Sequence, residues 1–259
     1  MIPMLQLVLR DLWRSRWPAA YGLFLLATSE ALFAFGENRA QAVASLLTVT
    51  VLVVPTMTLA LGVSQCFDWR YCAELLLAQP VRRGAIFAGQ YVGLTLVLSL
   101  SFVFGVGLPF LWMGLGSRAA AQALAVLLAA GILLTLVFGA LALLLGTASE
   151  QRLPALGRAF SLALFLCVVY DGILLAAATG LADYRLEKPL LALALLNPVD
   201  AARLLVLLKL DVAALTGYTG AVMQQFFGAG AQSVALLPLA LWVAVPAALA
   251  YRAYQRRDF

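Results

Sequence analysis

The stretch Ala120–Leu145 reads AAQALAVLLAAGILLTLVFGALALLL and contains no charged side chain. A helix rises about 1.5 Å per residue, so about 20 apolar residues cross a hydrocarbon core of about 30 Å. The apolar residues of this stretch do not alternate with the period of two that marks a barrel strand. The stretch therefore predicts a transmembrane helix. Five further segments satisfy the same criteria, and they are Trp17–Phe35, Ala42–Ser64, Ala88–Trp112, Ala159–Leu181 and Ala231–Tyr251.

The composition of the whole chain also indicates a membrane protein. Of the 259 residues, 64% are hydrophobic and 11% are charged, and the mean hydropathy is +0.99. An ordinary soluble domain is about 45–50% apolar and about 25% charged. A soluble enzyme, a disordered chain and a fibrous repeat are therefore excluded. We expect an all-α polytopic membrane protein, with one transmembrane domain of six helices over residues 1–259.

The stretch Leu191–Leu210 is also apolar, but it contains Asp200, Arg203 and Lys209. A central Asp or Arg costs about 2.5–3.5 kcal/mol on membrane insertion. We therefore predict that this stretch lies at the membrane interface. Three residues are expected to form its face toward the bilayer, and they are Leu204, Leu207 and Leu208.

The basic residues predict the orientation. With six spans and both termini in the cytoplasm, most of the 17 Lys and Arg residues fall on the cytoplasmic side, as the positive-inside rule requires. Topology thus accounts for the net charge of +5, and no nucleic-acid partner is expected.

Residues 1–16 place Leu5, Leu9 and Leu12 on one face, which predicts an interfacial amphipathic helix, with a plain topogenic flank as the alternative.

The loop after the second span, residues 65–87, reads QCFDWRYCAELLLAQPVRRGAIF. A bare connector needs only a few residues, whereas this loop combines aromatic, acidic and basic side chains. We predict a docking surface with a short helix over Tyr71–Ala78, ending before Pro80; a plain connector is the alternative. The residues expected to couple the loop to a cytoplasmic partner are Asp68, Arg70, Glu74, Arg82 and Arg83.

Residues 182–230, between the fifth and sixth spans, form the largest segment expected outside the bilayer. Asn197 is predicted to cap a helix that begins at Pro198, with Asp200 and Arg203 able to pair at i, i+3. We interpret the segment as an external platform for a partner, and passive re-entrant packing is the alternative. The residues expected to bind the partner are Tyr218, Gln224, Gln225, Phe226 and Phe227.

Two acidic residues, Glu30 and Asp171, fall inside the predicted spans. Intramembrane acids are candidate functional residues by default. Glu30 lies near the outer end of its span, where it can reach the interface. Asp171 lies deeper, beside Tyr170, and this pair is the candidate for a transport path; protonation and a hydrogen bond to another helix are the alternatives for Asp171.

Pro55 in the second span predicts a kink, because proline removes one helical hydrogen bond. Thr50 and Thr56 are expected to donate hydrogen bonds to the backbone groups that the proline leaves without a partner.

The chain lacks the groups that intramembrane chemistry requires. It has no histidine and only three cysteines, so no metal site or cofactor is expected in this chain. No GxSxG or HExxH motif occurs, and the two lysines, Lys188 and Lys209, are not part of a phosphate loop. The sequence shows no channel filter and no internal repeat typical of secondary transporters. We expect a non-enzyme, driven by another subunit if it performs work.

Several motifs together resemble the ABC-2 type permease family. They are the amphipathic N-terminus, ELLLAQPVRRGAIFAGQYVGL after the second span, the external LNPVDAARLL and the terminal RRDF. GVGLPFL at Gly105–Leu111 and LDVAALTGYTGAVMQQFFG at Leu210–Gly228 resemble the branch of this family that serves maturation of nitrous oxide reductase.

The resemblance implies a type V exporter-like fold and a homodimer in a bacterial inner membrane. It also implies two ABC ATPase subunits that bind ATP and Mg, and a periplasmic copper-handling β-helix protein. The family's task in denitrification is assembly of a copper–sulfur centre. Because soft ligands are scarce in this chain, a sulfur species or mechanical signalling fits it better than a copper path does. An exporter of a lipid, drug or polysaccharide and a non-transporting scaffold are the alternatives.

Overall fold

The computed structural model describes residues 10, 15–35, 39–70, 83–113, 118–180, 187–209 and 231–256. Every regular element within these residues is helical. Six stretches are long and apolar enough to cross a membrane: Arg16–Phe35, Ala42–Asp68, Arg83–Trp112, Ala121–Thr147, Arg152–Gly180 and Leu236–Arg256. These stretches coincide with the six predicted spans, which confirms the predicted fold class.

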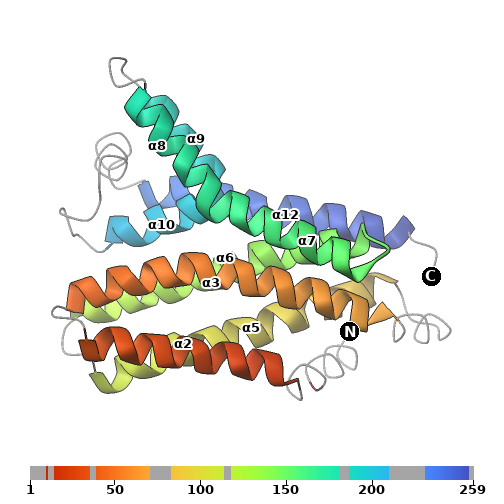
Figure 1. The fold of residues 1–259 in the computed structure, drawn as a ribbon, viewed down its shortest axis with the longest axis horizontal. Helices are drawn as coiled ribbons and strands as arrows, with labels where there is room; N and C mark the ends of the chain where they lie inside the picture. The colour runs from red at the N-terminus through yellow and green to blue at the C-terminus, as the bar shows by residue number, and fades with distance from the viewer. Residues whose placement is uncertain are drawn as a thin grey trace.

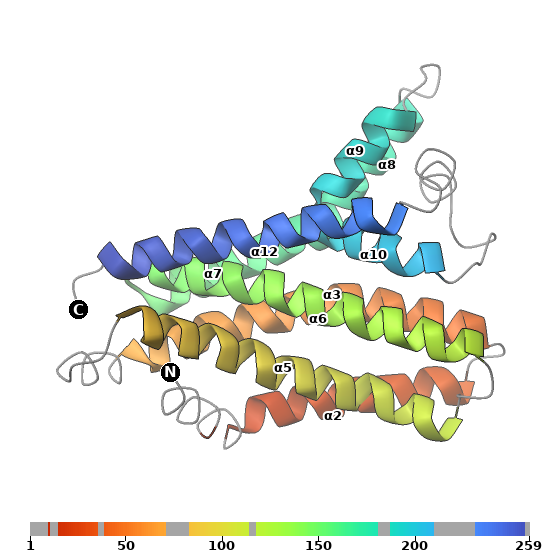
Figure 2. The same cartoon turned by 180° about the vertical axis from the view of Figure 1, so that it is seen from behind.

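The first four spans are α2 (Arg16–Phe35), α3 (Arg39–Asp68), α5 (Arg83–Met113) and α6 (Arg118–Thr147). They lie side by side along the long axis of the molecule (Figures 1 and 2). α6 is central, since it contacts α3, α5, α10 and α12. In the most apolar part of α6, 61% of the residues are buried. In the most apolar part of α12, the last span, only 17% are buried. The last span therefore presents most of its surface to the surroundings.

Glycines allow the first four spans to approach closely. A Cβ atom at Gly105 of α5 would lie 2.7 Å from the carbonyl oxygen of Gly22 in α2, and a Cβ atom at Gly62 of α3 would lie 2.6 Å from the Cβ of Ala142 in α6. Lipid tails are as apolar as leucine, so helices in a membrane associate through such close van der Waals contact. These glycines thus set the spacing of the bundle.

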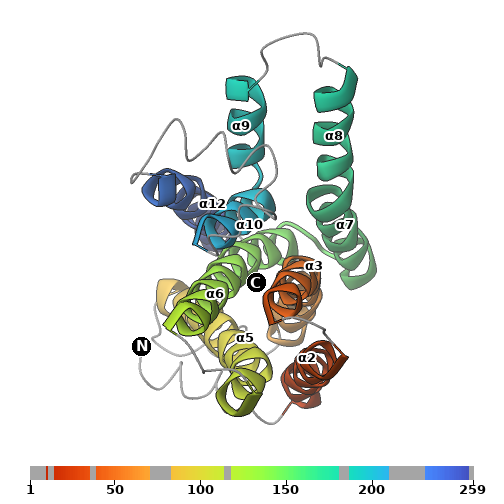
Figure 3. The same cartoon turned by 90° about the vertical axis from the view of Figure 1, so that its left-hand side faces the viewer.

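The second half of the chain is less regular. The fifth span consists of α7 (Arg152–Leu164), a π-helical turn η1 (Phe165–Val169) and α8 (Tyr170–Gly180), followed by α9 (Glu187–Leu196), α10 (Pro198–Lys209) and the last span α12 (Ala231–Arg256). Together α8 and α9 form an arm that projects away from the bundle, as the view in Figure 3 shows. α10 returns to the bundle and packs between α6 and α12.

The exposed face toward the bilayer predicted for Leu204 is wrong. α9 and α10 form a pair bent by 109°, and α10 packs inside the bundle. Leu204, expected to face the bilayer surface, is 5% exposed, and Val199 and Val206 are fully buried. The insertion cost that argued against burial assumed isolated charges, whereas Asp200 and Arg203 have partners within the bundle.

The kink residue Pro55 lies inside α3, as predicted. A proline at position 55 leaves the carbonyl of Val51 without its helical donor. The thiol of Cys167 donates to this carbonyl at 3.6 Å. Thr56 bonds instead to the carbonyl of Leu52 at 2.7 Å, and the hydroxyl of Thr50 has no partner among the described residues. The two threonines therefore do not replace the missing bond.

Three predicted features lie outside the described residues. They are most of the amphipathic helix over 1–16, the short helix Tyr71–Ala78, and the aromatic and amide residues of the external segment, Tyr218, Gln224, Gln225, Phe226 and Phe227.

Candidate functional site

Arg70 follows directly after α3 and caps the end of α6. Its Nη1 donates to the carbonyl oxygen of Glu150 at 2.8 Å, and its Nη2 donates to the carbonyl oxygens of Gly146, at 3.0 Å, and Ser149. Its guanidinium lies 3.7 Å from the centroid of the Phe67 ring. The last carbonyls of a helix lack helical donors and form the negative end of its dipole. A cation here therefore binds three carbonyls at once and joins α3 to α6.

A second contact at this end joins α3 to the fifth span. Arg152, the first residue of α7, lies 2.8 Å from Asp68 at the end of α3. Both side chains are about half exposed, so the pair contributes at most about 1 kcal/mol. Arg158 donates to the Ser149 hydroxyl at 2.6 Å. We call Asp68, Arg70, Ser149, Arg152 and Arg158 the Arg70 clamp, and this end of the bundle the Arg70 end.

The predicted coupling residues divide into two groups. Asp68 and Arg70 belong to the clamp, whereas Glu74 and Arg82 lie outside the described residues. Arg83 begins α5 and donates to the carbonyl of Gln255, near the end of α12, at 2.9 Å. Both ends of the predicted docking loop are thus tied to other helices of the bundle.

A cavity of about 630 Å³ opens at the Arg70 end between α2, α3, α5 and α7. Its deeper wall is apolar and includes Met57, Leu98 and Phe160. Polar groups gather toward the clamp, where Gln65 lines the cavity beside Asp68. The amide oxygen and nitrogen of Gln65 are buried and have no partner among the described residues. The sequence-based interpretation missed this cavity, since residues from four separate helices form it.

A polar junction lies where the fifth span meets α10. A π-helical turn widens the helix and leaves backbone groups out of register. Asn197 donates to the carbonyl of Leu166 within that turn at 2.8 Å, while its own side-chain oxygen accepts from the backbone nitrogen of Val199 at 3.1 Å. Asn197 is 1% exposed. The predicted cap is confirmed, and the same side chain also binds the neighbouring span.

Arg203 joins two carboxylates at this junction. Its Nη1 lies 2.8 Å from Oδ2 of Asp171 and 3.6 Å from Oδ1 of Asp200. The second oxygen of Asp200 accepts from the amide of Asn197 at 3.0 Å. The predicted i, i+3 pair is therefore confirmed, and Asp171 has the partner on another helix that was one of its predicted alternatives. The separation of Asp171 and Arg203 along the chain does not predict their contact.

Tyr170, predicted to act with Asp171, binds a different helix. Its hydroxyl donates to the carbonyl of Leu193 in α9 at 2.7 Å. Trp242 of α12 donates to the carbonyl of Leu196, at the end of α9, at 2.9 Å. Both carbonyls belong to the last turn of α9, where helical donors are lacking. The first bond thus joins the two helices of the arm, and the second ties the base of the arm to α12.

Within the described ranges, no group of three or more His, Cys, Asp or Glu residues is arranged to hold a metal ion. Cys66 and Cys167 are both buried. The fifth span is tied to neighbouring helices at two places, by the ion pair of Arg152 with Asp68 at its start and by that of Asp171 with Arg203 farther along.

Six helices of membrane-spanning length in the described part of the chain define a multi-pass membrane protein. A profile of the ABC-2 family transporter proteins matches residues 72–259. A relative from Pseudomonas aeruginosa named "Probable ABC transporter permease protein NosY" is 31% identical over 266 residues, with 96% of this chain and 95% of the relative covered. A protein of the same name from Stutzerimonas stutzeri is 27% identical over 269 residues, with the same shares covered. The chain belongs to the ABC-2 family of transporter permeases.

Proposed function

We propose that this chain is the membrane subunit of an ATP-driven transporter that serves assembly of the copper–sulfur centre of nitrous oxide reductase. It would act as a homodimer with two NosF-like ATPase subunits and a periplasmic NosD-like β-helix protein. The names of the two relatives support this assignment, as does the absence of a phosphate loop from the sequence. The ATPase subunits would bind ATP and Mg, and this chain would hold no cofactor.

The observation that carries the proposal is the Arg70 clamp. We place both termini and the Arg70 end in the cytoplasm, on the distribution of basic residues. The docking loop leaves α3 directly after Arg70 and rejoins the bundle at Arg83, which binds the end of α12. A force applied to the loop by an ATPase subunit would therefore act on α3, α6, α7 and α12 together.

The fifth span connects the clamp to the outer part of the molecule. It begins at Arg152, paired with Asp68, and continues through the π-helical turn to Asp171, paired with Arg203 of α10. Because Asn197 binds the π-helical turn, a shift of α7 along its axis would also move α10. The segment that follows α10 contains Tyr218, Gln224 and Phe226, which we propose to contact the periplasmic protein.

The direct test exchanges the charges of the Asp68–Arg152 pair. Asp68→Arg and Arg152→Asp should each reduce assembly of the copper–sulfur centre, measured by its absorption in purified reductase, and should uncouple ATP hydrolysis. The double variant restores the opposite charges and should recover much of both. Glu150→Arg reverses an exposed charge in the same turn and is the matched control. Equal loss in the single and double variants would remove the pair from the coupling path.

Partner contact is tested separately. A photo-crosslinking residue placed at positions 217–227 should capture the β-helix protein in membranes. Crosslinks that form only from the short loops near residues 37–39 and 117–118 would contradict the proposed surface while leaving the ATPase coupling intact.

The cargo proposed is a sulfur species, or no solute at all if the complex signals mechanically to its periplasmic partner. Purified permease should retain no stoichiometric copper after mild chelation, because the chain has no histidine and two of its three cysteines are buried apart from any ligand cluster in the described residues. Copper bound at one per chain and lost on changing Cys66, Cys72 or Met57 would contradict this.

Export of an amphipathic molecule, such as a lipid or drug, is the second candidate function. The cavity at the Arg70 end favours it, because apolar walls at Met57 and Phe160 adjoin the unpartnered amide of Gln65. Gln65→Leu should then change the ATPase response to added solutes while leaving assembly of the reductase centre unchanged. If the variant instead impairs that assembly, the cavity belongs to the first function.

A further inference from the structure

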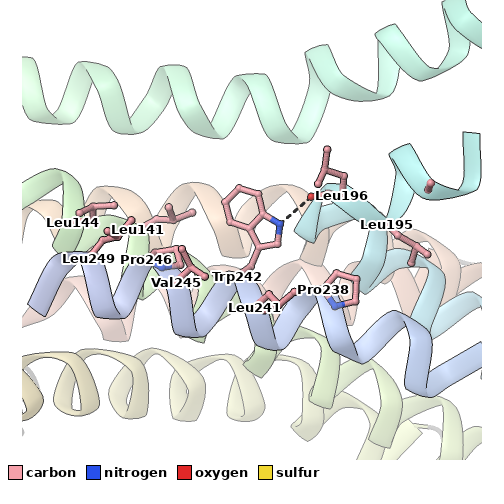
Figure 4. Close-up of a pocket in the computed structure, with 11 residues that line it drawn as sticks. Leu141, Leu144, Leu195, Leu196, Pro238, Leu241, Trp242, Val245, Pro246 and Leu249 are labelled. Atoms are coloured by element: carbon pink, nitrogen blue, oxygen red, sulfur yellow. Dashed lines mark hydrogen bonds between the residues drawn. The ribbon is translucent and has the colours of Figure 1, made fainter. Parts of the chain in front are cut away.

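An apolar groove of about 560 Å³ runs along α12 where this helix meets α6 and α9. Figure 4 shows Pro238, Leu241, Val245 and Leu249 along its α12 side. Every residue that lines the groove is apolar apart from the indole nitrogen of Trp242, and that nitrogen donates to the carbonyl of Leu196. The groove therefore offers no hydrogen-bonding group to a polar solute.

The described part of the chain leaves this groove open. Leu241, Val245 and Leu249 are 54%, 52% and 46% exposed. All three lie inside the last span, Leu236–Arg256. A groove of this composition at membrane depth is filled by hydrocarbon, since water gains no hydrogen bonds there.

The distance from Arg252 to the middle of the groove fits one leaflet of a bilayer. From Arg252 to Leu241 the helix axis advances about 16 Å, at about 1.5 Å per residue. Half of a typical hydrocarbon core is about 15 Å. One acyl chain that reaches from the membrane surface at Arg252 to the midplane would therefore occupy the groove as far as Leu241.

A basic cluster continues the same face of α12 beyond the groove. Arg252 follows Leu249 by three residues and Arg256 follows by seven, so their side chains lie above the groove on one helix face. Both are exposed and neither forms an ion pair with another described residue. Arg83 lies next to them, since it donates to the carbonyl of Gln255. The groove thus ends at positive charge at the membrane surface.

We propose that the α12 groove is a binding site for an anionic phospholipid of the leaflet at the Arg70 end. An acyl chain lies against Leu241, Val245 and Leu249, and the phosphate lies at Arg252 and Arg256. Basic pockets beside transmembrane helices recognise anionic headgroups through charge, and each Arg near the surface contributes to the attraction. The inference is independent of the cargo and of the periplasmic partner.

Charge and shape together distinguish this occupant from a second copy of the chain. A helix face of the partner would cover the leucines, but it would leave Arg252 and Arg256 facing each other or the solvent. A phospholipid satisfies both parts of the surface with one molecule. The Trp242–Leu196 bond holds α9 at the outer end of the groove, and the lipid chain would pack against this contact.

The test measures lipid retained by purified permease after reconstitution in bilayers of one part phosphatidylglycerol to three parts phosphatidylethanolamine. Native mass spectrometry counts the lipids that remain after extraction in mild detergent. The double variant Arg252→Gln/Arg256→Gln should lower retention of phosphatidylglycerol roughly thirtyfold, since each Arg contributes about 1 kcal/mol near a charged surface and the two together about 2 kcal/mol. Arg10→Gln/Arg16→Gln removes two exposed charges near the start of the first span and should leave retention unchanged.

A second variant tests the groove itself. Val245→Trp fills it and should lower retention of phosphatidylglycerol and phosphatidylethanolamine alike, and Leu249→Phe serves if the first variant does not fold. Equal loss in the two double Arg variants, or unchanged retention after filling the groove, overturns the proposal. If filling the groove dissociates a dimer without changing lipid retention, a second copy occupies this face and the proposal is wrong.

Discussion

Nη1 of Arg203 lies 2.8 Å from Oδ2 of Asp171 and joins the fifth span to α10, while the same nitrogen lies 3.6 Å from Asp200. One cation therefore serves two carboxylates, of which Asp200 is buried while Asp171, like Arg203 itself, is about one third exposed. Removing one partner of a buried charged group is costly because it leaves an uncompensated charge. The three residues are consequently not equivalent, and the cation is the one whose loss matters most.

We expect Arg203→Gln to destabilise the permease more than Asp171→Asn does. The first change leaves Asp171 and Asp200 without their cation and should cost roughly 3 kcal/mol, whereas the second leaves the Arg203–Asp200 pair and should cost about 1 kcal/mol. Thermal unfolding in detergent measures both. Arg16→Gln, at an exposed position, is the control. Equal losses from the two changes would show that Asp200 does not share the cation.

The side chain of Asn197 makes three contacts: its amide nitrogen donates to the carbonyl of Leu166 and to Asp200, and its oxygen accepts from the backbone nitrogen of Val199. Asn197→Ser retains an oxygen that can accept from Val199 but loses the amide donor to Leu166 and Asp200, while Asn197→Ala loses all three contacts. We expect a loss of about 1 kcal/mol for the cap and a further 1–2 kcal/mol for the unsatisfied carbonyl in the π-helical turn. Serine should therefore be intermediate in thermal stability. A serine variant as stable as the natural protein would show that the bond to Leu166 contributes nothing.

The bond between Cys167 and the carbonyl of Val51 should depend on Pro55. Cys167→Ala removes the donor and should cost about 1 kcal/mol, whereas Cys167→Ser keeps a donor and should cost less. In a Pro55→Ala background, the restored backbone N–H supplies the Val51 carbonyl, so Cys167→Ala should cost clearly less than it does with Pro55 present. A double-mutant cycle measures this coupling. Additive effects of the two changes would mean that the thiol does not replace the missing helical bond.

Arg70 should not be replaceable by lysine. The planar guanidinium reaches the carbonyls of Gly146, Ser149 and Glu150 and lies 3.7 Å from the centroid of the Phe67 ring, and an ammonium group cannot match this geometry. We expect Arg70→Lys to lose about 1–2 kcal/mol of stability and to weaken ATPase coupling. Arg152→Lys is the control, since an exposed single ion pair tolerates the exchange. Similar behaviour of the two lysine variants would argue against a structural clamp.

The membrane class, the six spans and the cap at Asn197 were all predictable from the amino-acid sequence. Hydropathy over about 20 residues and the preference for Asn before Pro are local properties, so they can be read without neighbours. The lack of a phosphate loop is likewise a property of the chain alone. The predicted roles of Glu74, Arg82 and the outer aromatic residues stay predictions.

Only the tertiary structure decided which polar groups meet. Asp171 and Arg203 are 32 positions apart, and Cys167 and Val51 are 116 apart. Their contacts depend on the π-helical turn in the fifth span and on the 109° bend between α9 and α10. The same bend places α10 inside the bundle, so Leu204 is buried and does not face the bilayer. Asp171 of the fifth span supplies a partner for Arg203, and Asn197 and Arg203 supply partners for Asp200, which lowers the cost of burying these groups.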